Sequence, residues 1–267
     1  MEYNSPDIIL HFYDENGDLR FMTEAQDIDR FLRDWPFESG VVTARLVQAE
    51  DGREVLQMRI EMGILQMEVT DRPDGEKPEG SPTYLAYLVR TAADAAESFA
   101  ISDEQAFEVD REFYQYYHRR ICWLALREFD RATADADHTL ALMDFVVAHS
   151  PNEEWVLSHE QYRPFVLFHR TQAAALARLE ESGPEAAIEE IQRGLDRIHE
   201  VFTAVNGEEQ FEEDEMVLQL RRLQEWLREH YEVGQTLAEQ LAKAVASEQY
   251  ELAARLRDEI AKRGNRR

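Results

Sequence analysis

The chain has 267 residues, of which 44% are hydrophobic and 31% charged, and this composition excludes disorder throughout while allowing one large core or two modest ones. Its formal net charge of −26 at pH 7, from 55 acidic and 29 basic residues, repels phosphate backbones and anionic membrane surfaces, so direct nucleic-acid contact and membrane binding are disfavoured. The single cysteine, Cys122, excludes an intramolecular disulfide and a thiolate zinc site.

The N-terminal stretch MEYNSPDIILHFYDENGDLRF lacks the basic start and the long apolar core of a secretion signal, so none is expected. No apolar run in the sequence approaches the roughly 20 residues that a helix needs to cross a bilayer. We therefore expect a soluble cytoplasmic protein.

Residues 8–70 carry strand and turn signals. Apolar runs flank Asn16-Gly17 and Asp51-Gly52, and both dipeptides favour the positive backbone angles of a tight hairpin. Between the two hairpins, residues 28–32 place apolar side chains at helical spacing. The pattern predicts a small antiparallel sheet with one inserted helix.

Residues 71–82, DRPDGEKPEGSP, contain proline and glycine at a density that ends any regular element, and they form the clearest predicted linker. Gly75 and Gly80 have the spacing of a phosphate-binding loop, but Ser81 stands where that loop requires lysine. Without this charge the segment is a weak phosphate cradle, so no ATPase activity is expected.

Beyond the linker the pattern is almost wholly helical. Ser102 and Gln105 form a predicted capping box that opens the helix through FEVDREFYQYYHRRICWLAL. The following helix carries a stripe of small and apolar residues on one face, namely Ala132, Ala136, Leu140, Met143 and Val147. Two further helices are divided where Gly183 can cap one and Pro184 can open the next. The acidic run NGEEQFEEDE then precedes another helix.

Two of the helical pairs resemble divergent tetratricopeptide repeats. The resemblance rests on aromatic and small positions in the second half of each repeat, which are Phe129, Ala132, Thr139 and Leu140 in one pair and Ala187, Gly194 and Leu195 in the other. Arg120 departs from the pattern, because it stands where the family has a small residue. The resemblance implies stacked helical hairpins, and plain antiparallel helices without a peptide-binding groove are the alternative.

The C-terminal tail carries strong local helix signals. Thr236 and Glu239 form a predicted capping box. Apolar residues then recur on one face of each of two short helices, at Leu237, Leu241, Ala244 and Val245 and again at Ala253, Leu256 and Ile260. A hairpin of this size falls below the roughly 40 residues at which a chain folds unaided, so its apolar seam is predicted to dock on another surface. Packing against the protein's own helices is the alternative.

The segment from Leu237 to Lys262 resembles the UVR motif, the helical hairpin of UvrB, UvrC and ClpC-type chaperones. The matching positions are Tyr250-Glu251, Ala253-Ala254, Leu256-Arg257-Asp258 and Ile260, and the departures are Leu241 and Arg263-Gly264. The resemblance implies a bacterial protein whose hairpin pairs with a similar hairpin of another protein or of a second copy. The predicted partner-binding residues are Leu237, Leu241, Val245, Tyr250, Ala253, Ala254, Leu256, Arg257, Asp258 and Ile260.

The expected fold is α+β, with a small N-terminal antiparallel sheet, helical hairpins and a terminal UVR-like hairpin. Four parts are predicted: a mixed domain in residues 1–80, a tetratricopeptide-like scaffold in 81–206, an acidic linker and connecting helix in 207–235, and the hairpin in 236–264.

No residues form a catalytic constellation, so the sequence predicts an interaction protein and not an enzyme, with no cofactor and no metal. His149, His159 and His169 recur every ten residues, a spacing that is more often chance than coordination. The acidic run lacks the spaced carboxylates and central glycine of a calcium loop. An enzyme in the N-terminal sheet domain is a third possibility that rests on no visible residues.

Two features keep a nucleic-acid role open as the alternative. The basic end RLRDEIAKRGNRR favours a DNA-repair accessory protein, whose binding would depend on salt. A second basic and aromatic cluster can form a base-stacking platform, although helical spacing makes most of it core, and its members are Tyr114, Tyr117, Arg119, Arg120 and Trp123.

Overall fold

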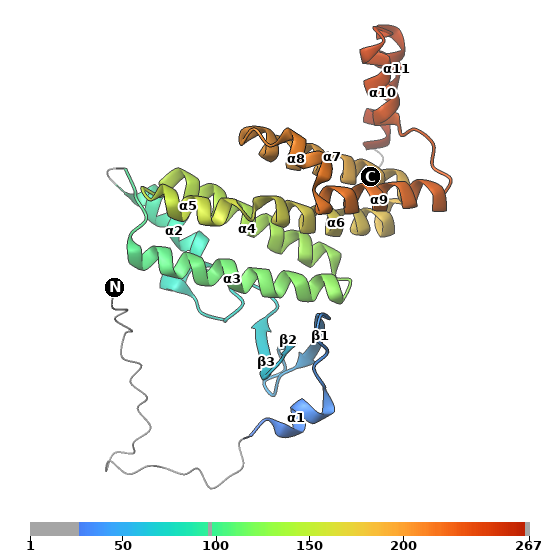
Figure 1. Cartoon of the computed structure of the whole chain (residues 1–267). Helices are drawn as coiled ribbons and strands as arrows, with labels where there is room; N and C mark the ends of the chain where they lie inside the picture. Colours follow the sequence, from blue (N-terminus) through green and yellow to red (C-terminus); the bar gives the residue numbers. More distant parts are fainter. Residues whose placement is uncertain (1–26, 96–97, 265–267) are drawn as a thin grey trace, which may run out of the picture.

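The structure is a computed structural model that describes residues 27–95 and 98–264. In this part of the chain an antiparallel sheet is followed by helices that stack side by side, and a terminal pair of helices projects from the stack (Figure 1). The strands are β1 (Thr43–Gln48), β2 (Glu54–Ile60) and β3 (Gly63–Glu68). The helices are α1 (Asp29–Asp34), the 3₁₀ turn η1 (Pro78–Gly80), α2 (Tyr84–Asp94), α3 (Asp103–Ala125), α4 (Phe129–His149), α5 (Glu153–Glu160), α6 (Arg163–Ser182), α7 (Pro184–Ala204), α8 (Glu208–Glu213), α9 (Glu215–His230), α10 (Leu237–Ala246) and α11 (Tyr250–Gly264).

The α+β fold class and the antiparallel sheet are confirmed. Strands β1, β2 and β3 are neighbours in chain order, and the β1–β2 turn contains Gly52 at a φ of +85°, as the Asp51-Gly52 pattern predicts. The predicted inserted helix is present as α1, although none of its residues is buried. The hairpin predicted at Asn16-Gly17 lies outside the described residues.

The sheet packs against the helices through a shared apolar core. Strand β2 contributes Leu56 and β3 contributes Met67, and both pack with Cys122 and Trp123 of α3 and with Ala132 of α4. Burial raises the pKa of the Cys122 thiol to about 12, so this thiol stays protonated at neutral pH. The sheet is therefore attached to the helices by buried side chains, while the domain division at residue 80 stays a prediction.

The predicted linker 71–82 contains one 3₁₀ turn and is held against α3 by the buried Arg72. Arg72 forms ion pairs with Glu108 at 2.7 Å and with Glu112 at 3.7 Å. Burial raises the pKa of Glu108, but the hydrogen bonds from Arg72 and Arg111 outweigh it and hold that pKa below its usual range. The segment is thus a docked loop rather than a free linker.

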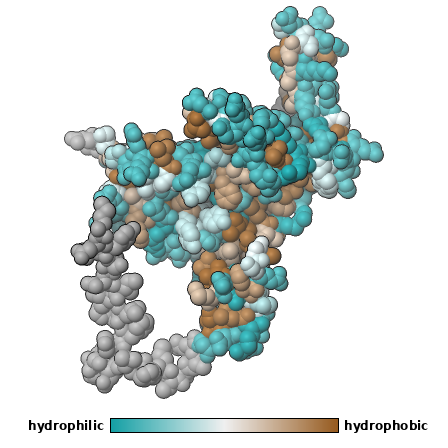
Figure 2. Space-filling model, viewed as in Figure 1, coloured by the Kyte–Doolittle hydropathy of each residue, from teal (hydrophilic) through white to brown (hydrophobic). Residues whose placement is uncertain are grey.

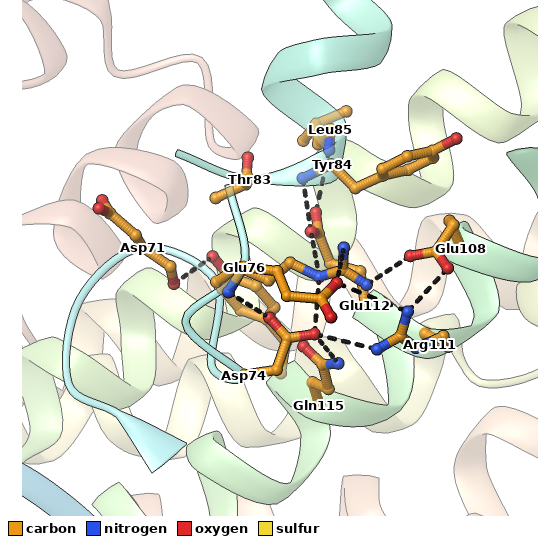
Figure 3. A network of polar contacts seen from close by, with 12 residues as sticks. Asp71, Asp74, Glu76, Thr83, Tyr84, Leu85, Glu108, Arg111, Glu112 and Gln115 are labelled. Atoms are coloured by element: carbon orange, nitrogen blue, oxygen red, sulfur yellow. Dashed lines mark hydrogen bonds and ion pairs between the residues drawn. The ribbon is translucent and has the colours of Figure 1, made fainter. Parts of the chain in front are cut away.

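Glu112 also fixes the start of α2. Its carboxylate accepts backbone hydrogen bonds from Tyr84 at 2.6 Å and from Leu85 at 3.0 Å, two of the amides that an N-terminus leaves without helical acceptors (Figure 3). Because Glu112 is buried in α3, this contact joins the two helices and orients the loop between the sheet and α2.

The helices after the loop follow the predicted order with three corrections. The capping box at Ser102 and the break at Gly183-Pro184 are confirmed. In the α4 stripe Val147 is exposed and Val146 is buried instead. With 3.6 residues per turn, the next buried position after Met143 is three residues further along the helix and not four. Two short helices, α5 and α8, were not predicted, and α8 lies inside the segment predicted as an acidic linker.

The largest apolar cluster lies between α4, α6, α7 and α9. Helices α3 and α4 form one packed pair and α6 and α7 another, which confirms the predicted helical hairpins. Their assignment to tetratricopeptide repeats stays a prediction. None of the described helices combines the length and apolar composition of a membrane span.

Candidate interaction hairpin

The hairpin α10–α11 begins at a capping box, as predicted. The Thr236 hydroxyl accepts a hydrogen bond from the backbone amide of Glu239 at 3.2 Å, and the Glu239 carboxylate accepts one from the amide of Thr236 at 2.8 Å. Two amides at the helix end are satisfied by these reciprocal bonds. Thr236 is itself buried, so water cannot easily replace the hydroxyl.

Thr236→Val is expected to destabilise the hairpin by about 1 kcal/mol, because valine keeps the side-chain shape and removes the capping oxygen. This loss corresponds to a roughly fivefold fall in amide hydrogen-exchange protection. Exchange measured by mass spectrometry should show the fall in α10 and α11 and leave α6 and α7 unchanged. Thr203→Val, at an exposed position of α7, is the control. Unchanged protection of α10 would contradict a capping role for Thr236.

A tight turn reverses the chain between the two helices. The amides of Ser247 and Gln249 donate to the carbonyls of Lys243 and Ala244 at 3.0 and 2.8 Å, and Glu248 adopts a left-handed φ of +56°. These bonds satisfy the last carbonyls of α10 and send α11 back beside it. The predicted antiparallel pairing of the two short helices is thus set by local backbone geometry.

The seam between the helices is a small apolar core of its own. Ala244, Ala253 and Leu256 are buried there, and Leu237 and Leu241 pack against them. The small side chains of Ala244 and Ala253 allow the two backbones to approach. Within the described residues this cluster is separate from the three clusters of the sheet and helical stack.

The ten predicted partner-binding residues divide into two groups. Five are buried or half-buried, namely Leu237, Leu241, Ala253, Leu256 and Ile260, and the first four of these form the seam or pack against it. Those on the outside are Val245, Tyr250, Ala254, Arg257 and Asp258, which are exposed. The first group holds the hairpin together, and the second is accessible to another molecule.

The exposed residues form an outer face of the hairpin. Tyr250, Ala254 and Arg257 are spaced i, i+4 and i+7, so they lie along one side of α11. Val245 lies next to the seam positions of α10, just as Tyr250 does on α11. Because the two helices run antiparallel, these flanking positions face the same side of the hairpin. Val245 is 52% exposed and Tyr250 is 67% exposed. We call these four residues the outer face.

The hairpin projects from the end of α9 as an arm (Figure 1). Its surface is mainly hydrophilic with apolar patches among the polar residues (Figure 2). At its base Arg228 of α9 forms an ion pair with Glu239 and donates a hydrogen bond to the carbonyl of Gly234 at 2.9 Å. Sequence reasoning missed this anchor, because the two partners belong to different helices and share no local motif.

Two of the histidines that recur every ten residues, His159 and His169, lie in different surroundings. His159 is paired with Asp110 at 2.9 Å, whereas His169 is half-buried beside Arg120. Burial, with the charge of Arg120, lowers the pKa of His169 to about 3, so this imidazole is neutral at physiological pH.

The predicted stacking platform does not form as one surface. Trp123 is buried in the core shared with the sheet, and Arg119 is buried in an ion pair with Asp135. Tyr114, Tyr117 and Arg120 remain together at the edge of a pocket on α3. The platform interpretation is therefore wrong for Trp123 and Arg119.

Comparison with known proteins identifies one segment of the chain. No curated protein and no solved structure matches the chain. A family model described as UVR, UvrB/uvrC motif, matches residues 235–262, which form α10 and most of α11. A motif of this kind typically mediates protein–protein interaction through a helical hairpin. The tail of this chain, residues 235–262, therefore carries a UVR motif.

Proposed function

We propose that this protein is an adaptor that captures a protein partner with the outer face of its terminal hairpin, and that it performs no catalytic step itself. The observation that carries the proposal is the exposure of Val245 and Tyr250 on an arm that projects from the helical stack. Tyrosine supplies a large apolar contact area with a polar tip and is enriched among residues that dominate binding energy.

The energetics of the hairpin favour a partner. Its own core consists of three buried residues, two of which are alanines, so its folding buries little apolar surface. Each Å² of apolar surface removed from water contributes about 25 cal/mol. Covering the outer face with a partner adds the burial that the isolated arm lacks, and binding therefore also stabilises the arm.

The partner that best fits the outer face is a second helical hairpin of the same kind, either in another protein or in a second copy of this chain. Ala254 has a small side chain that allows a neighbouring helix to approach closely. Arg257 and Asp258 form a mutual ion pair at 3.3 Å with both side chains exposed, and they can exchange it for contacts with an opposite hairpin. Charges at such a rim select the partner more than they strengthen binding.

Tyr250→Asp and Val245→Asp in the full chain are expected to weaken partner binding by at least about tenfold, because each places a charge in the apolar part of the interface. Self-association is measured by sedimentation velocity over a range of concentrations. Binding to other proteins is measured by crosslinking in lysate, with the crosslinked peptides identified by mass spectrometry.

The matched control is Arg255→Gln. Like Tyr250→Asp it makes the net charge more negative by one, but Arg255 is an exposed residue on a different side of α11. It should leave binding unchanged. The proposal fails if both aspartate variants retain the sedimentation behaviour and the crosslinked partners of the wild type. Leu256→Asp is a poorer test, because Leu256 lies in the hairpin's own core and its loss unfolds the arm.

A further inference from the structure

A pocket of about 660 Å³ opens on the side of the helical stack, where one face of α3 meets the corner between α5 and α6. The α3 residues at this face recur at helical spacing, from Asp110 through Phe113 and Tyr117 to Arg120. This volume suits a small organic molecule, since ligand pockets commonly span about 300–1,000 Å³. The pocket shares no residue with the terminal hairpin.

The walls of the pocket are aromatic. They are formed by Phe113, Tyr114, Tyr117, Tyr162 and Phe165. Their rings contact one another, with centroid distances of 6.5 Å from Phe113 to Tyr162 and 6.2 Å from Tyr117 to Phe165. Such walls accept a flat apolar body, which stacks on or packs against the rings.

Arg120 lines the same pocket and is only 1% exposed. Its Nη1 donates to the Thr139 hydroxyl at 3.0 Å, and its Nε donates to His169 Nδ1 at 3.4 Å. A guanidinium has five N–H donors, so these two neutral acceptors leave part of its capacity unused. Among the described residues, no carboxylate forms an ion pair with Arg120.

The nearby carboxylates are already occupied by other groups. Asp135 accepts hydrogen bonds from Nε and Nη2 of Arg119, at 2.9 and 2.7 Å. Asp110, at the pocket, pairs with His159 at 2.9 Å and accepts a hydrogen bond from the Trp155 indole at 3.0 Å. Burial lowers the pKa of Arg120 to about 10 despite the charge of Asp135, as expected for a cation without a close counterion.

We propose that this pocket binds a small organic acid, in which one carboxylate is held by Arg120 and a flat apolar body lies between the aromatic walls. Buried charges in proteins are normally paired, and a carboxylate matches both the charge and the planar donor geometry of a guanidinium. One negative charge suits the site better than two, because Asp110 at the pocket repels a second.

The test is isothermal titration calorimetry of the full chain with 3-phenylpropionate. Saturable binding of one molecule per chain is expected, and the neutral isostere 3-phenylpropanamide should bind at least about tenfold more weakly, because charge-assisted hydrogen bonds are the stronger ones. Phenyl phosphate should bind more weakly than 3-phenylpropionate. No saturable binding, or equal binding of the acid and its amide, overturns the proposal.

Arg120→Met should abolish binding of 3-phenylpropionate without unfolding the protein, since an apolar side chain replaces a buried cation that lacks a counterion. Arg127→Met, at an exposed arginine paired with Glu180, is the control and should bind normally. If Arg120→Met does not fold, Tyr114→Ala tests the pocket instead. Tyr114 is exposed, and its loss should weaken binding several-fold. Unchanged affinity in the variant that folds overturns the assignment.

A peptide with a C-terminal carboxylate presents the same chemistry as a small acid. The tripeptide acetyl-Gly-Gly-Phe distinguishes the two sources, because its backbone has to extend out of the pocket. It should bind more weakly than 3-phenylpropionate. Tighter binding of the tripeptide would overturn the small-acid assignment in favour of a polypeptide C-terminus. Because the pocket shares no residue with the hairpin, a failure of the proposed partner binding by the hairpin would not change any of these ligand-binding outcomes.

Discussion

Asp135→Ala is expected to lower the free energy of unfolding by about 3–5 kcal/mol, because it leaves the buried guanidinium of Arg119 without its carboxylate. The two groups form a bidentate pair, with Nε to Oδ2 at 2.9 Å and Nη2 to Oδ1 at 2.7 Å. Their side chains are 5% and 6% exposed, so water cannot take the place of the lost carboxylate. Burial alone lowers the pKa of Arg119, and the contact with Asp135 outweighs it and raises that pKa.

The effect should extend beyond α3 and α4. Arg119 also donates hydrogen bonds to the carbonyls of Glu68 and Asp71, at 3.0 and 2.9 Å, at the end of β3. Its guanidinium carbon lies 4.6 Å from the ring centre of Tyr116. The same side chain thus joins the sheet to the helices, and its displacement should loosen the core that they share.

Urea unfolding followed by circular dichroism measures the loss. The control is Glu180→Ala, which removes an Arg–Glu contact to Arg127 whose side chains are 57% and 74% exposed, and which should cost about 0–1 kcal/mol. The double variant Arg119→Met/Asp135→Leu should recover part of the stability, since apolar replacements remove both buried charges. Full recovery is not expected, because the carbonyls of Glu68 and Asp71 lose a donor. A loss below about 1 kcal/mol for Asp135→Ala would contradict a structural role for the pair.

Local signals in the sequence predicted local structure well. The capping boxes at Ser102 and Thr236 and the turn at Asp51-Gly52 depend on residues within a few positions of one another, and the structure contains all three. The sequence carries a comparable local signal for α5. Asn152 caps that helix by accepting a hydrogen bond from the amide of Trp155 at 3.0 Å, and two glutamates follow it.

Tertiary contacts account for what the sequence did not reveal. Arg72 lies in a segment rich in proline and glycine, and its burial depends on Glu108 and Glu112, which are distant in the chain. In the same way, the acidic composition around α8 predicts a solvated linker, but Phe211 is buried against the main core. A single buried ring or charge can dock a segment whose average composition is that of a loop.

The candidate hairpin shows the same division between local and tertiary information. The spacing of apolar residues located both helices and their seam. It did not separate the residues that close the seam, such as Leu256, from those that face outward, such as Tyr250, because both groups recur at helical intervals. That distinction depends on how α10 and α11 are rotated against each other, which the turn at residues 247–249 determines.

Gly194→Ala is expected to destabilise the protein by up to about 2 kcal/mol, although alanine is the better helix former. A Cβ at Gly194 of α7 would lie 2.1 Å from both the Cγ2 and the Oγ1 atoms of Thr171 in α6, far inside any contact distance. Thr171 is buried, and its hydroxyl donates to the carbonyl of Leu167 at 2.7 Å, so the side chain has little room to turn away. Relief requires α6 and α7 to separate.

Two opposing effects decide the sign of this substitution. Replacing glycine by alanine inside a helix contributes about 1 kcal/mol of stability, whereas overpacking a filled core costs about 1–3 kcal/mol or more. The overpacking should dominate here, because α6 and α7 carry much of the largest apolar cluster, including Ala175, Ile191 and Ile198. Moving these helices apart weakens packing along their whole length.

A double-mutant cycle with Thr171 separates the two effects. Thr171→Ala is insufficient as the second change, because the Cβ of residue 171 would still lie 2.6 Å from the new methyl group. In a Thr171→Gly background the methyl group has room, so Gly194→Ala should become neutral or stabilising when unfolding is followed in urea. This reversal of sign is the specific consequence of a close helix crossing at Gly194. If Gly194→Ala stabilises the otherwise unchanged protein, α6 and α7 do not approach each other as closely as the structure indicates.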